Sequence, residues 1–470
     1  MVNAVAKYQK YAEYKDSGVE WLGEIPIHWD LFALKRSIDK CTNGFWGAEP
    51  DGINDLCVLR VADFDRDNFK INLDKLTYRS VLPKEAESRL LKNGDLLIEK
   101  SGGGEKTLVG CVVQFDKDFP AITSNFVAKM TPNSNMDSRF LTYSFAHLYS
   151  GRVNYPAIKQ TTGIQNLDSE AYLMENFCFP SKMEQIKIAN FLDHETAKID
   201  SLIEKQQQLI ELLKEKRQAV ISHAVTKGLN PNVPMKDSGV EWLGQVPEHW
   251  GVSRLKNIIC SLESGCSVNA ADIPAQSYEL GVLKTSCVYT RSFRIEENKT
   301  VVPEDIHRVK CKIRKGAIII SRMNTPELVG ASALVKVEAD NIYLPDRLWQ
   351  TKFFQNIEID AEYLSHFMTV QGFRDQIALG AEGASSSMQN IAKEDYLNIN
   401  CLVPPLKEQI EIRDFIERKL AILSELNMKA QEAVECLKER RTALISAAVT
   451  GKIDVRNWQN PTEAKMEFSA

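Results

Sequence analysis

A chain of 470 residues with 44% hydrophobic and 26% charged residues has the size and composition of a globular protein with several domains. No stretch approaches the roughly 18 apolar residues that cross a bilayer, and residues 1–16 lack the apolar segment of an export signal, so we expect a cytoplasmic protein with no membrane partner. The 10 cysteines form no C-x-x-C pair, which argues against a zinc site, and the net charge of −5 argues against tight DNA binding by this chain alone.

The chain repeats itself, beginning with a segment near its N-terminus. Residues 14–35 (YKDSGVEWLGEIPIHWDLFALK) return as residues 235–256 (MKDSGVEWLGQVPEHWGVSRLK). Each copy predicts a short helix, a Gly-x-x-Pro turn and a tryptophan, Trp29 or Trp250, that anchors the entry to a globular unit. Nothing in the segment carries chemistry, so we expect it to serve packing.

Each entry segment is followed by a globular unit that is rich in short strands. Four runs in the first unit combine β-forming residues with flanking Gly, Asp, Asn or Pro, and one longer run has helical spacing. These runs predict strands at 56–64, 94–100, 110–116 and 125–130 and a helix at 136–153. Residues 257–404 repeat this order with little identity, so we expect two domains of the α+β class.

Two long segments without glycine or proline, 184–225 and 408–449, predict amphipathic helices that pair with each other. Each helix would extend about 60 Å at ~1.5 Å per residue. Taking Ile199 as position a of a heptad, apolar side chains recur at the alternating spacing that is typical of a coiled-coil seam. The predicted seam consists of Ile199, Leu202, Leu209, Leu213 and Val220 in the first helix and of Leu423, Leu426, Leu437 and Leu444 in the second.

Three loops differ between the two copies although the framework around them repeats. The pairs are 59–64 with 283–288, 100–110 with 321–330, and 161–170 with 385–394. Loops rich in Gly, Ser, Asn and Lys are most often solvated turns, but three of them at matching places on a repeated scaffold favour variable recognition. We therefore predict that these loops bind the ligand of each unit.

The sequence contains no catalytic constellation. It lacks a G-x-x-x-x-G-K-[ST] phosphate loop, a G-x-G-x-x-G after a strand, and the H-E-x-x-H or H-x-E with C-x-x-C patterns of zinc enzymes. Asp95, Glu99 and Lys100 faintly suggest a nuclease carboxylate cluster, but Gly316-Ala317-Ile318 removes the aspartate from the second copy. We predict a non-catalytic binder and spacer that itself holds neither metal nor cofactor.

The order of the motifs resembles one known family. A junction approximating P-x-x-x-E-Q-x-x-I precedes each long helix at 180–188 and 404–412, and R-x-A-[VL]-I-S-x-A-V-T ends it at 217–226 and 441–450. Together with the doubled globular units, these motifs resemble the specificity subunit of Type I restriction–modification systems over essentially the whole chain. One departure is Ser181-Lys182-Met183, which replaces the usual proline-rich junction in the first copy.

The resemblance implies two target recognition domains, residues 1–180 and 235–404, each reading one half of a split, asymmetric DNA site. The helical segments 181–234 and 405–470 would pair antiparallel as a spacer with pseudo-two-fold symmetry, and the polar tail 454–470 would be loosely held. Partners would be two adenine-N6 methyltransferase subunits using S-adenosylmethionine and up to two motor-nuclease restriction subunits using ATP and magnesium.

Two alternatives stay open. A coiled-coil scaffold would bind protein partners through its globular units, and the acidic net charge favours it slightly. A specificity subunit serving a solitary methyltransferase would lack the nuclease partner.

The predicted contacts with double-stranded DNA lie in the three variable loops. Lysine and arginine there would reach phosphate or guanine, and asparagine or glutamine would suit adenine. The first copy contributes Arg60, Asp63, Lys100, Ser101, Gly102, Lys106, Gln165 and Asn166. The second copy contributes Lys284, Thr285, Ser286, Arg322, Asn324, Ser387, Gln389 and Asn390.

Overall fold

The computed structural model describes residues 8–104, 107–161, 163–385 and 388–460, and it divides the chain into two compact units of mixed α and β structure. Unit 1 comprises Met1–Gln207 with Gln431–Ala470, and unit 2 comprises Gln208–Ala430. Each of the two long helices therefore contributes one half to each unit. None of the described helices is long and apolar enough to cross a membrane.

Unit 1 is built on two sheets and a covering helix. The larger sheet is antiparallel, in the order β11 (Val112–Gln114), β9 (Leu96–Glu99), β13 (Val127–Pro132) and β4 (Ile38–Asn43). The smaller sheet has the order β12 (Ala121–Thr123), β5 (Asp55–Leu59) and β8 (Tyr78–Ser80). Helix α2 (Ser138–Ser150) is capped at its N-terminus by Asp137, whose carboxylate accepts hydrogen bonds from two amides of the first turn. The predicted strands at 94–100, 110–116 and 125–130 and the helix at 136–153 are thus confirmed. The predicted strand at 56–64 is confirmed only as far as Leu59, because residues 61–63 form a 3-10 turn before a separate short strand.

Several shorter elements complete unit 1. Strands β3 (Asp30–Ala33) and β16 (Asn176–Phe179) pair antiparallel, as do β6 (Phe64–Asp65) and β7 (Lys70–Ile71). The helical turns are η2 (Leu34–Ser37), η3 (Val61–Asp63), α1 (Pro83–Ala86), η4 (Tyr155–Ala157) and α3 (Ser169–Leu173).

Unit 2 has the same order of major elements. One sheet runs β20 (Ile259–Ser264), β28 (Leu348–Phe353), β24 (Ile318–Ser321) and β26 (Ser332–Leu334). The other runs β21 (Ala270–Ala271), β23 (Asn298–Val301), β22 (Gly281–Leu283) and β27 (Ile342–Tyr343). The pair β19 (Gly251–Arg254) and β31 (Asn400–Val403), the helices α5 (Ala361–Phe367), α6 (Gln371–Gly380) and α7 (Lys393–Asn398), and the turns η5 (Leu255–Asn257), η6 (Thr285–Val288) and η7 (Pro303–Arg308) complete it.

The repeated entry segments are β-hairpins, so the predicted short helix is wrong. In unit 1, β1 (Tyr14–Asp16) pairs with β2 (Glu24–Pro26), and in unit 2, β17 (Met235–Asp237) pairs with β18 (Gln245–Pro247). Gly18 and Gly23 adopt positive φ angles of 67° and 64°, which close the connecting turn instead of extending a helix. The tryptophans do anchor the entry, because Trp29 and Trp250 are both buried.

A glutamate at the start of each long helix holds this tryptophan. In unit 1, Glu184 accepts hydrogen bonds from Trp29 Nε1 at 3.2 Å and from the Tyr11 hydroxyl at 2.7 Å. In unit 2, Glu408 accepts one from Trp250 Nε1 at 3.0 Å. The shared Glu-Gln junction and the shared His-Trp entry, far apart in sequence, are therefore two sides of one contact.

The next residue of the junction docks the same helix to the globular part. Gln185 accepts a hydrogen bond from the Asp137 amide at 2.9 Å and donates one to the Pro180 carbonyl at 2.9 Å. Gln409 repeats the contact with the Asp360 amide at 2.8 Å. Both glutamines join the start of a long helix to the start of a short one.

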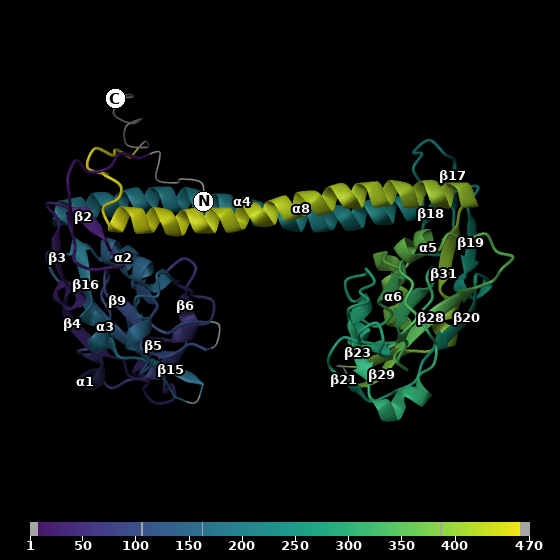
Figure 1. Cartoon of the computed structure of the whole chain (residues 1–470), viewed down its shortest axis with the longest axis horizontal. Helices are drawn as coiled ribbons and strands as arrows, with labels where there is room; N and C mark the ends of the chain where they lie inside the picture. The colour runs from purple at the N-terminus through teal and green to yellow at the C-terminus, as the bar shows by residue number, and fades with distance from the viewer. Residues whose placement is uncertain (1–7, 105–106, 162, 386–387, 461–470) are drawn as a thin grey trace. The chain divides into compact units, whose positions relative to one another are not determined.

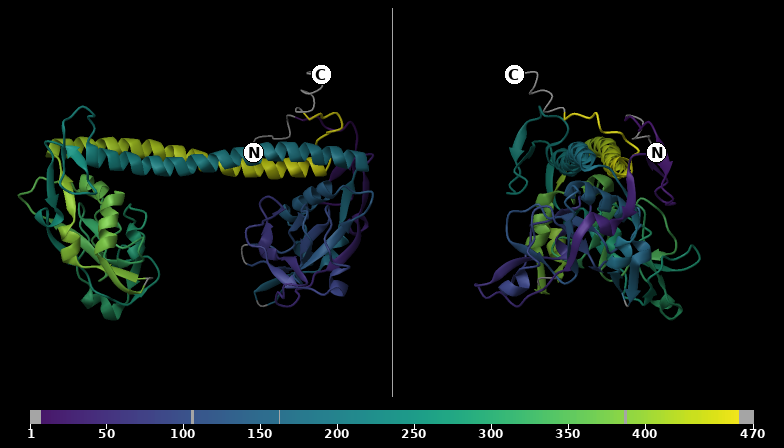
Figure 2. Two further views of the ribbon diagram at one scale, coloured as in Figure 1. Left: turned by 180° about the vertical axis from the view of Figure 1, so that it is seen from behind. Right: turned by 90° about the vertical axis from the view of Figure 1, so that its left-hand side faces the viewer.

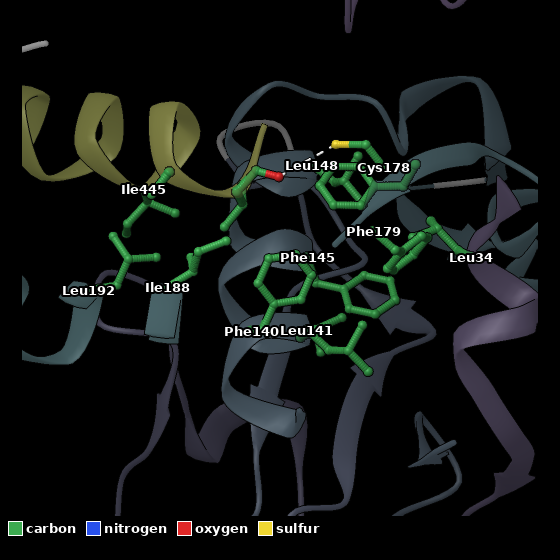
Figure 3. Close-up of a cluster of buried hydrophobic side chains, with 14 of the residues drawn as sticks. Leu34, Phe140, Leu141, Phe145, Leu148, Cys178, Phe179, Ile188, Leu192 and Ile445 are labelled. Atoms are coloured by element: carbon green, nitrogen blue, oxygen red, sulfur yellow. Dashed lines mark hydrogen bonds between the residues drawn. The ribbon is translucent and has the colours of Figure 1, made fainter. Parts of the chain in front are cut away.

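Helices α4 (Lys182–Lys227) and α8 (Leu406–Val449) confirm the two predicted long helices, and each is continuous (Figure 1). They lie side by side within each unit in every view (Figure 2). In unit 1, Arg441 Nε donates a hydrogen bond to Asp200 at 2.9 Å, and Ile445 lies beside Leu192 and Ile188 (Figure 3). Moving along α8 from Arg441 to Ile445, the contacting residues of α4 go back from Asp200 to Leu192. The two helices therefore run in opposite directions there.

The register of the seam differs from the prediction. Ile199, Leu213, Val220, Leu423, Leu437 and Leu444 are buried or partly buried as expected, whereas Leu202, Leu209 and Leu426 are 47%, 41% and 45% exposed. The residues that directly follow these three, Ile203, Ile210 and Asn427, are the more buried ones. Val434 and Arg441, which are both buried, continue the same spacing in α8. Ile199 therefore occupies a d position, so the next seam residue follows after four residues rather than three.

The first part of the C-terminal tail is packed, so the expectation of a loosely held tail is wrong for it. Val455 is 1% exposed, and the Asp454 amide donates a hydrogen bond to the Gln9 carbonyl at 2.8 Å. Trp458 meets Phe191 of α4 edge to face, with 5.6 Å between ring centroids. Residues 454–458 are thus held by the N-terminal segment and α4 of unit 1.

Candidate nucleic-acid interface

The predicted loops of unit 1 come together around a small sheet. Strands β10 (Ser101–Gly102), β15 (Ile164–Leu167) and β14 (Ile158–Thr161) form it, with Ser101 opposite Asn166 and Gly102 opposite Gln165. The remaining loop, 59–64, is adjacent, because a Cβ added to Gly102 would lie 3.3 Å from a Val61 methyl group. Three segments that are distant in sequence thus form one surface region.

Unit 2 assembles its loops in the same register. Strands β25 (Met323–Asn324), β30 (Met388–Ile391) and β29 (Ala381–Ser385) form the corresponding sheet, in which Met323 faces Asn390 and Asn324 faces Gln389. The remaining loop, 283–288, joins through the residue that follows it, Tyr289, whose hydroxyl accepts a hydrogen bond from Asn324 Nδ2 at 2.7 Å. The Gln-Asn pair shared by the two copies therefore marks one structural position.

Some predicted contact residues of unit 1 remain at the surface. Asn166 is exposed and its Oδ1 accepts a hydrogen bond from Ser101 Oγ at 2.7 Å. Lys100 is partly exposed, and its ammonium group donates to Asn43 Oδ1 at 2.6 Å. A ligand can reach these side chains by replacing one exposed hydrogen bond.

Other predicted contacts of unit 1 serve the protein itself. Asp63 is 5% exposed and accepts hydrogen bonds from the Arg60 amide and guanidinium, and this bonding raises the pKa of Arg60. Gln165 is 5% exposed with both ends of its amide bonded to the 104–109 backbone. The structure therefore places Asp63 and Gln165 beneath the loops, not on their outer face.

The first recognition loop of unit 2 is held by internal bonds. Lys284 forms an ion pair with Asp272 at 2.7 Å. Thr285 Oγ1 and the Tyr289 hydroxyl lie 2.8 Å apart, and Ser286 Oγ donates to Glu297 at 2.5 Å. All three predicted residues are partly exposed, so these bonds leave part of each side chain accessible.

The central loop of unit 2 divides in the same way. Asn324 is 8% exposed, its amide nitrogen donates to Tyr289 and Ser321, and its oxygen accepts from the Thr325 amide. An adenine contact by Asn324 would require exchange of these bonds. Arg322 and Gln389 are partly exposed and Asn390 is exposed, which is compatible with contact to a ligand. Lys106 and Ser387 lie outside the described residues.

An ion pair beneath the unit 1 loops was not predicted. Arg66 donates a hydrogen bond to the completely buried Glu99 at 2.8 Å. Burial raises the pKa of the Glu99 carboxyl, and Arg66 opposes that rise. The sequence marked Glu99 only as a faint nuclease residue. A glutamate at the end of an otherwise apolar strand was the available signal for a buried, paired carboxylate.

The faint nuclease cluster does not form. Asp95 accepts hydrogen bonds from the Lys92 amide at 2.8 Å and from Thr131 at 2.9 Å, which fixes the turn before β9. Glu99 binds Arg66 instead of facing Asp95. Within the described ranges, no group of three or more His, Cys, Asp or Glu side chains is placed to hold a metal ion.

Both units thus carry loops of unlike chemistry on the same strand register, and each contains part of both long helices. No family model matches the chain. It is 24% identical to the EcoKI specificity subunit of a Type I restriction enzyme from Escherichia coli strain K12, over 82% of this chain and 80% of that relative. It is 23% identical to the EcoEI specificity subunit from Escherichia coli over 52% of this chain, a match that spans only 41% of that relative.

A solved structure shares the fold. One chain, from work on complex assembly and conformational transition of the type I R-M system, superposes with a TM-score of 0.67 at 14% identity, over 90% of this chain and 98% of that one. These findings confirm the resemblance predicted from the doubled motifs: the chain is similar to the specificity subunits of Type I restriction–modification systems.

Proposed function

We propose that this protein is the DNA sequence-specificity subunit of a Type I restriction–modification complex, reading a bipartite, asymmetric site and directing partner enzymes to it. Unit 1 would read one half-site and unit 2 the other. The observation that carries the proposal is the convergence of three variable loops in the same strand register in both units. Similarity to named specificity subunits over four fifths of the chain supports it.

The difference between the two loop sets supports an asymmetric site. One scaffold used twice, in the pseudo-two-fold arrangement that we propose, would present a surface to each half of the duplex. At matching register positions, unit 1 has Ser101 and Gly102 where unit 2 has Met323 and Asn324. Side chains so different in hydrogen-bonding capacity suit different base edges.

The long helices supply a surface for protein partners. In the unit 2 halves of α4 and α8, Leu209, Leu212, Ile422, Leu426 and Met428 are between 41% and 60% exposed. Apolar residues exposed outside a helix seam suit docking of further helices. We assign this surface to two methyltransferase subunits, which would methylate adenine N6 and be joined by up to two restriction subunits.

The chemistry of the complex would belong to those partners. The methyltransferases would bring S-adenosylmethionine, and the restriction subunits would use ATP and magnesium to move along and cut unmethylated DNA. This chain would contribute sequence readout and spacing only. A negative net charge is compatible with that division, since partner subunits can supply the phosphate contacts that dominate affinity.

Co-expression with a matching methyltransferase tests the proposal. Methylation profiling of genomic DNA should reveal one bipartite motif, and native mass spectrometry should show one copy of this chain with two methyltransferases. Methylation of no defined sequence would favour the scaffold alternative. A motif without any restriction activity of the neighbouring genes would favour the solitary methyltransferase alternative.

A further inference from the structure

We propose that Gln165 and Glu99 are positioning residues that fix residues 102–104 and 107–110 of unit 1 from below and so set the specificity of one half-site without contacting DNA. The inference rests on the proposed function for its consequence, but its geometry belongs to this chain alone. It concerns the residues that follow Ser101 and begin with Gly102, one of the predicted DNA contacts.

Gln165 ties together two points of the segment. Its Oε1 accepts a hydrogen bond from the buried Val109 amide at 3.0 Å, and its Nε2 donates one to the Gly104 carbonyl at 3.1 Å. Both ends of the side-chain amide are therefore used, and its length matches the separation of the two backbone groups. A shorter or apolar residue cannot make both bonds.

The glycines of the segment are explained by these two side chains. A Cβ added to Gly102 would come within 2.7 Å of Glu99 Oε1, and one added to Gly103 would come within 2.8 Å of Gln165 Oε1. The φ angles of the two glycines, 149° and 67°, are also unfavourable for other residues. These glycines therefore accommodate side chains of the protein interior.

Two further side chains, the partly buried Tyr149 and the buried Asn154, hold the end of the segment. The Tyr149 hydroxyl donates to the Leu108 carbonyl at 2.8 Å, and Asn154 Nδ2 donates to the Val109 carbonyl at 2.6 Å. The segment is thus bound to side chains from β15, α2 and the turn after α2. Backbone held at Gly104, Leu108 and Val109 limits the arrangements of the described residues around these points, which lowers the ordering cost of binding.

Glu99 differs from the other supports because it carries a charge. It is completely buried and salt-bridged to Arg66, and Glu99 Oε2 has no hydrogen-bond partner among the described residues. Since the carboxylate lies against Gly102, any shift of the pair changes the position of the β10 strand. Glu99 therefore couples the 59–64 loop, which leads to Arg66, to the loop that contains Gly102.

The test uses the full chain with two near-isosteric variants, Gln165→Leu and Glu99→Gln. Gln185→Leu serves as the matched control, since Gln185 is an equally buried glutamine whose bonds lie at the α4 junction. Hydrogen exchange resolved to single amides is measured on the chain without DNA. Methylation profiling is performed in cells that also contain the methyltransferase. Circular dichroism and exchange in unit 2 verify that each variant folds.

Gln165→Leu should raise exchange at Val109 about fivefold, as loss of one buried hydrogen bond of ordinary strength predicts. Both loop variants should relax the methylated sequence at one half-site while the other half stays strict, and the control should relax neither. Unchanged exchange at Val109 would overturn the positioning role. Altered exchange with an unchanged motif would overturn the specificity role. A wild-type complex that methylates no defined motif would instead refute the proposed function, while the exchange result would still stand.

Discussion

The recognition loops of the two units are supported by different chemistry beneath the same backbone pairing. Gly102 and Asn324 occupy matching places opposite Gln165 and Gln389. Below Gly102 lies the buried Glu99 carboxylate with its arginine. At the equivalent place below Asn324 lies the neutral Ser321 hydroxyl, which accepts a hydrogen bond from the Asn324 side chain at 3.3 Å.

This difference teaches how one scaffold changes its specificity. The register of the small sheet is fixed by backbone hydrogen bonds, which do not depend on side-chain identity. In unit 1 the support is a charged pair under glycines, so the backbone of the loop lies close to the core. In unit 2 an asparagine fills that space, and its amide is used by Tyr289 and Ser321. The two units therefore keep one strand register above different buried groups.

The largest expected effect is on the charged support of unit 1. Arg66→Met leaves Glu99 buried without its partner, which should destabilise unit 1 by about 3 kcal/mol at pH 7, near the lower end for such pairs. The Arg66 side chain is 25% exposed, which moderates the loss. Stability should be measured by denaturant unfolding, with hydrogen exchange assigning the change to unit 1.

The pH dependence of this loss has a definite sign. Burial raises the pKa of Glu99 above 4.5, so the folded state holds the proton more tightly than the unfolded state, and the carboxylate disfavours folding increasingly as the pH rises from about 4.5 through the folded pKa. The Arg66→Met penalty should therefore be largest at pH 7 and small near pH 4. An equal loss at both pH values would show that packing, not charge, is responsible. The double variant with Glu99→Gln is the control and should recover most of the stability.

The corrected helix register predicts a second loss of stability of similar size, which can be measured in each unit separately. Leu213→Asp in the unit 2 half and Leu437→Asp in the unit 1 half place a charge in the seam and should each cost about 2–4 kcal/mol. Leu209→Asp and Leu426→Asp are matched controls on the exposed face, where a substitution changes stability by about 0.5 kcal/mol or less. Thermal unfolding of the four variants distinguishes the registers. Comparable losses in all four would restore the register predicted from the sequence.

The entry contacts predict a smaller difference between the units. Glu184→Gln should cost about 2 kcal/mol, because the buried carboxylate accepts bonds from Tyr11, His28 and Trp29. Glu408→Gln should cost about 1 kcal/mol, because its side chain is 25% exposed and the only partners that contact it in the described part of unit 2 are His249 and Trp250. Tryptophan fluorescence during unfolding reports both contacts. A larger loss for Glu408→Gln would contradict the ranking.

The sequence predicted the architecture well because its signals were local or repeated. Heptad spacing gave both long helices, and strand runs gave the central sheets of both units. It missed the seam register by one position, since Leu202 and Ile203 are both apolar and only packing decides between them. The entry hairpins were missed because two glycines with positive φ override a helix-like spacing.

The sequence predicted which loops form the candidate site, but not which of their side chains are exposed and which are buried. Matching loops identified the segments that meet, yet the sequence could not separate Asn166, which is exposed, from Gln165, which is buried beside it. Neighbours on a strand point to opposite faces, and which face is outward depends on pairing with a distant strand. The Arg66–Glu99 pair was missed for the same reason, as its partners are 33 residues apart.

The smallest expected effect tests the matching outer residues of the two loops. Asn166 and Asn390 are exposed and occupy the same register position opposite Ser101 and Met323. Asn166→Ala should weaken discrimination at one half-site by about 1 kcal/mol, and Asn390→Ala should do so at the other half by a similar amount, which is the lower end for a base contact. Methylation profiling of each variant measures the two halves separately. Neither change should alter the unfolding transition, since both side chains lie at the surface. If both variants relax the same half, the units do not read separate half-sites. If discrimination falls equally at both halves, the asparagines contact phosphate rather than bases.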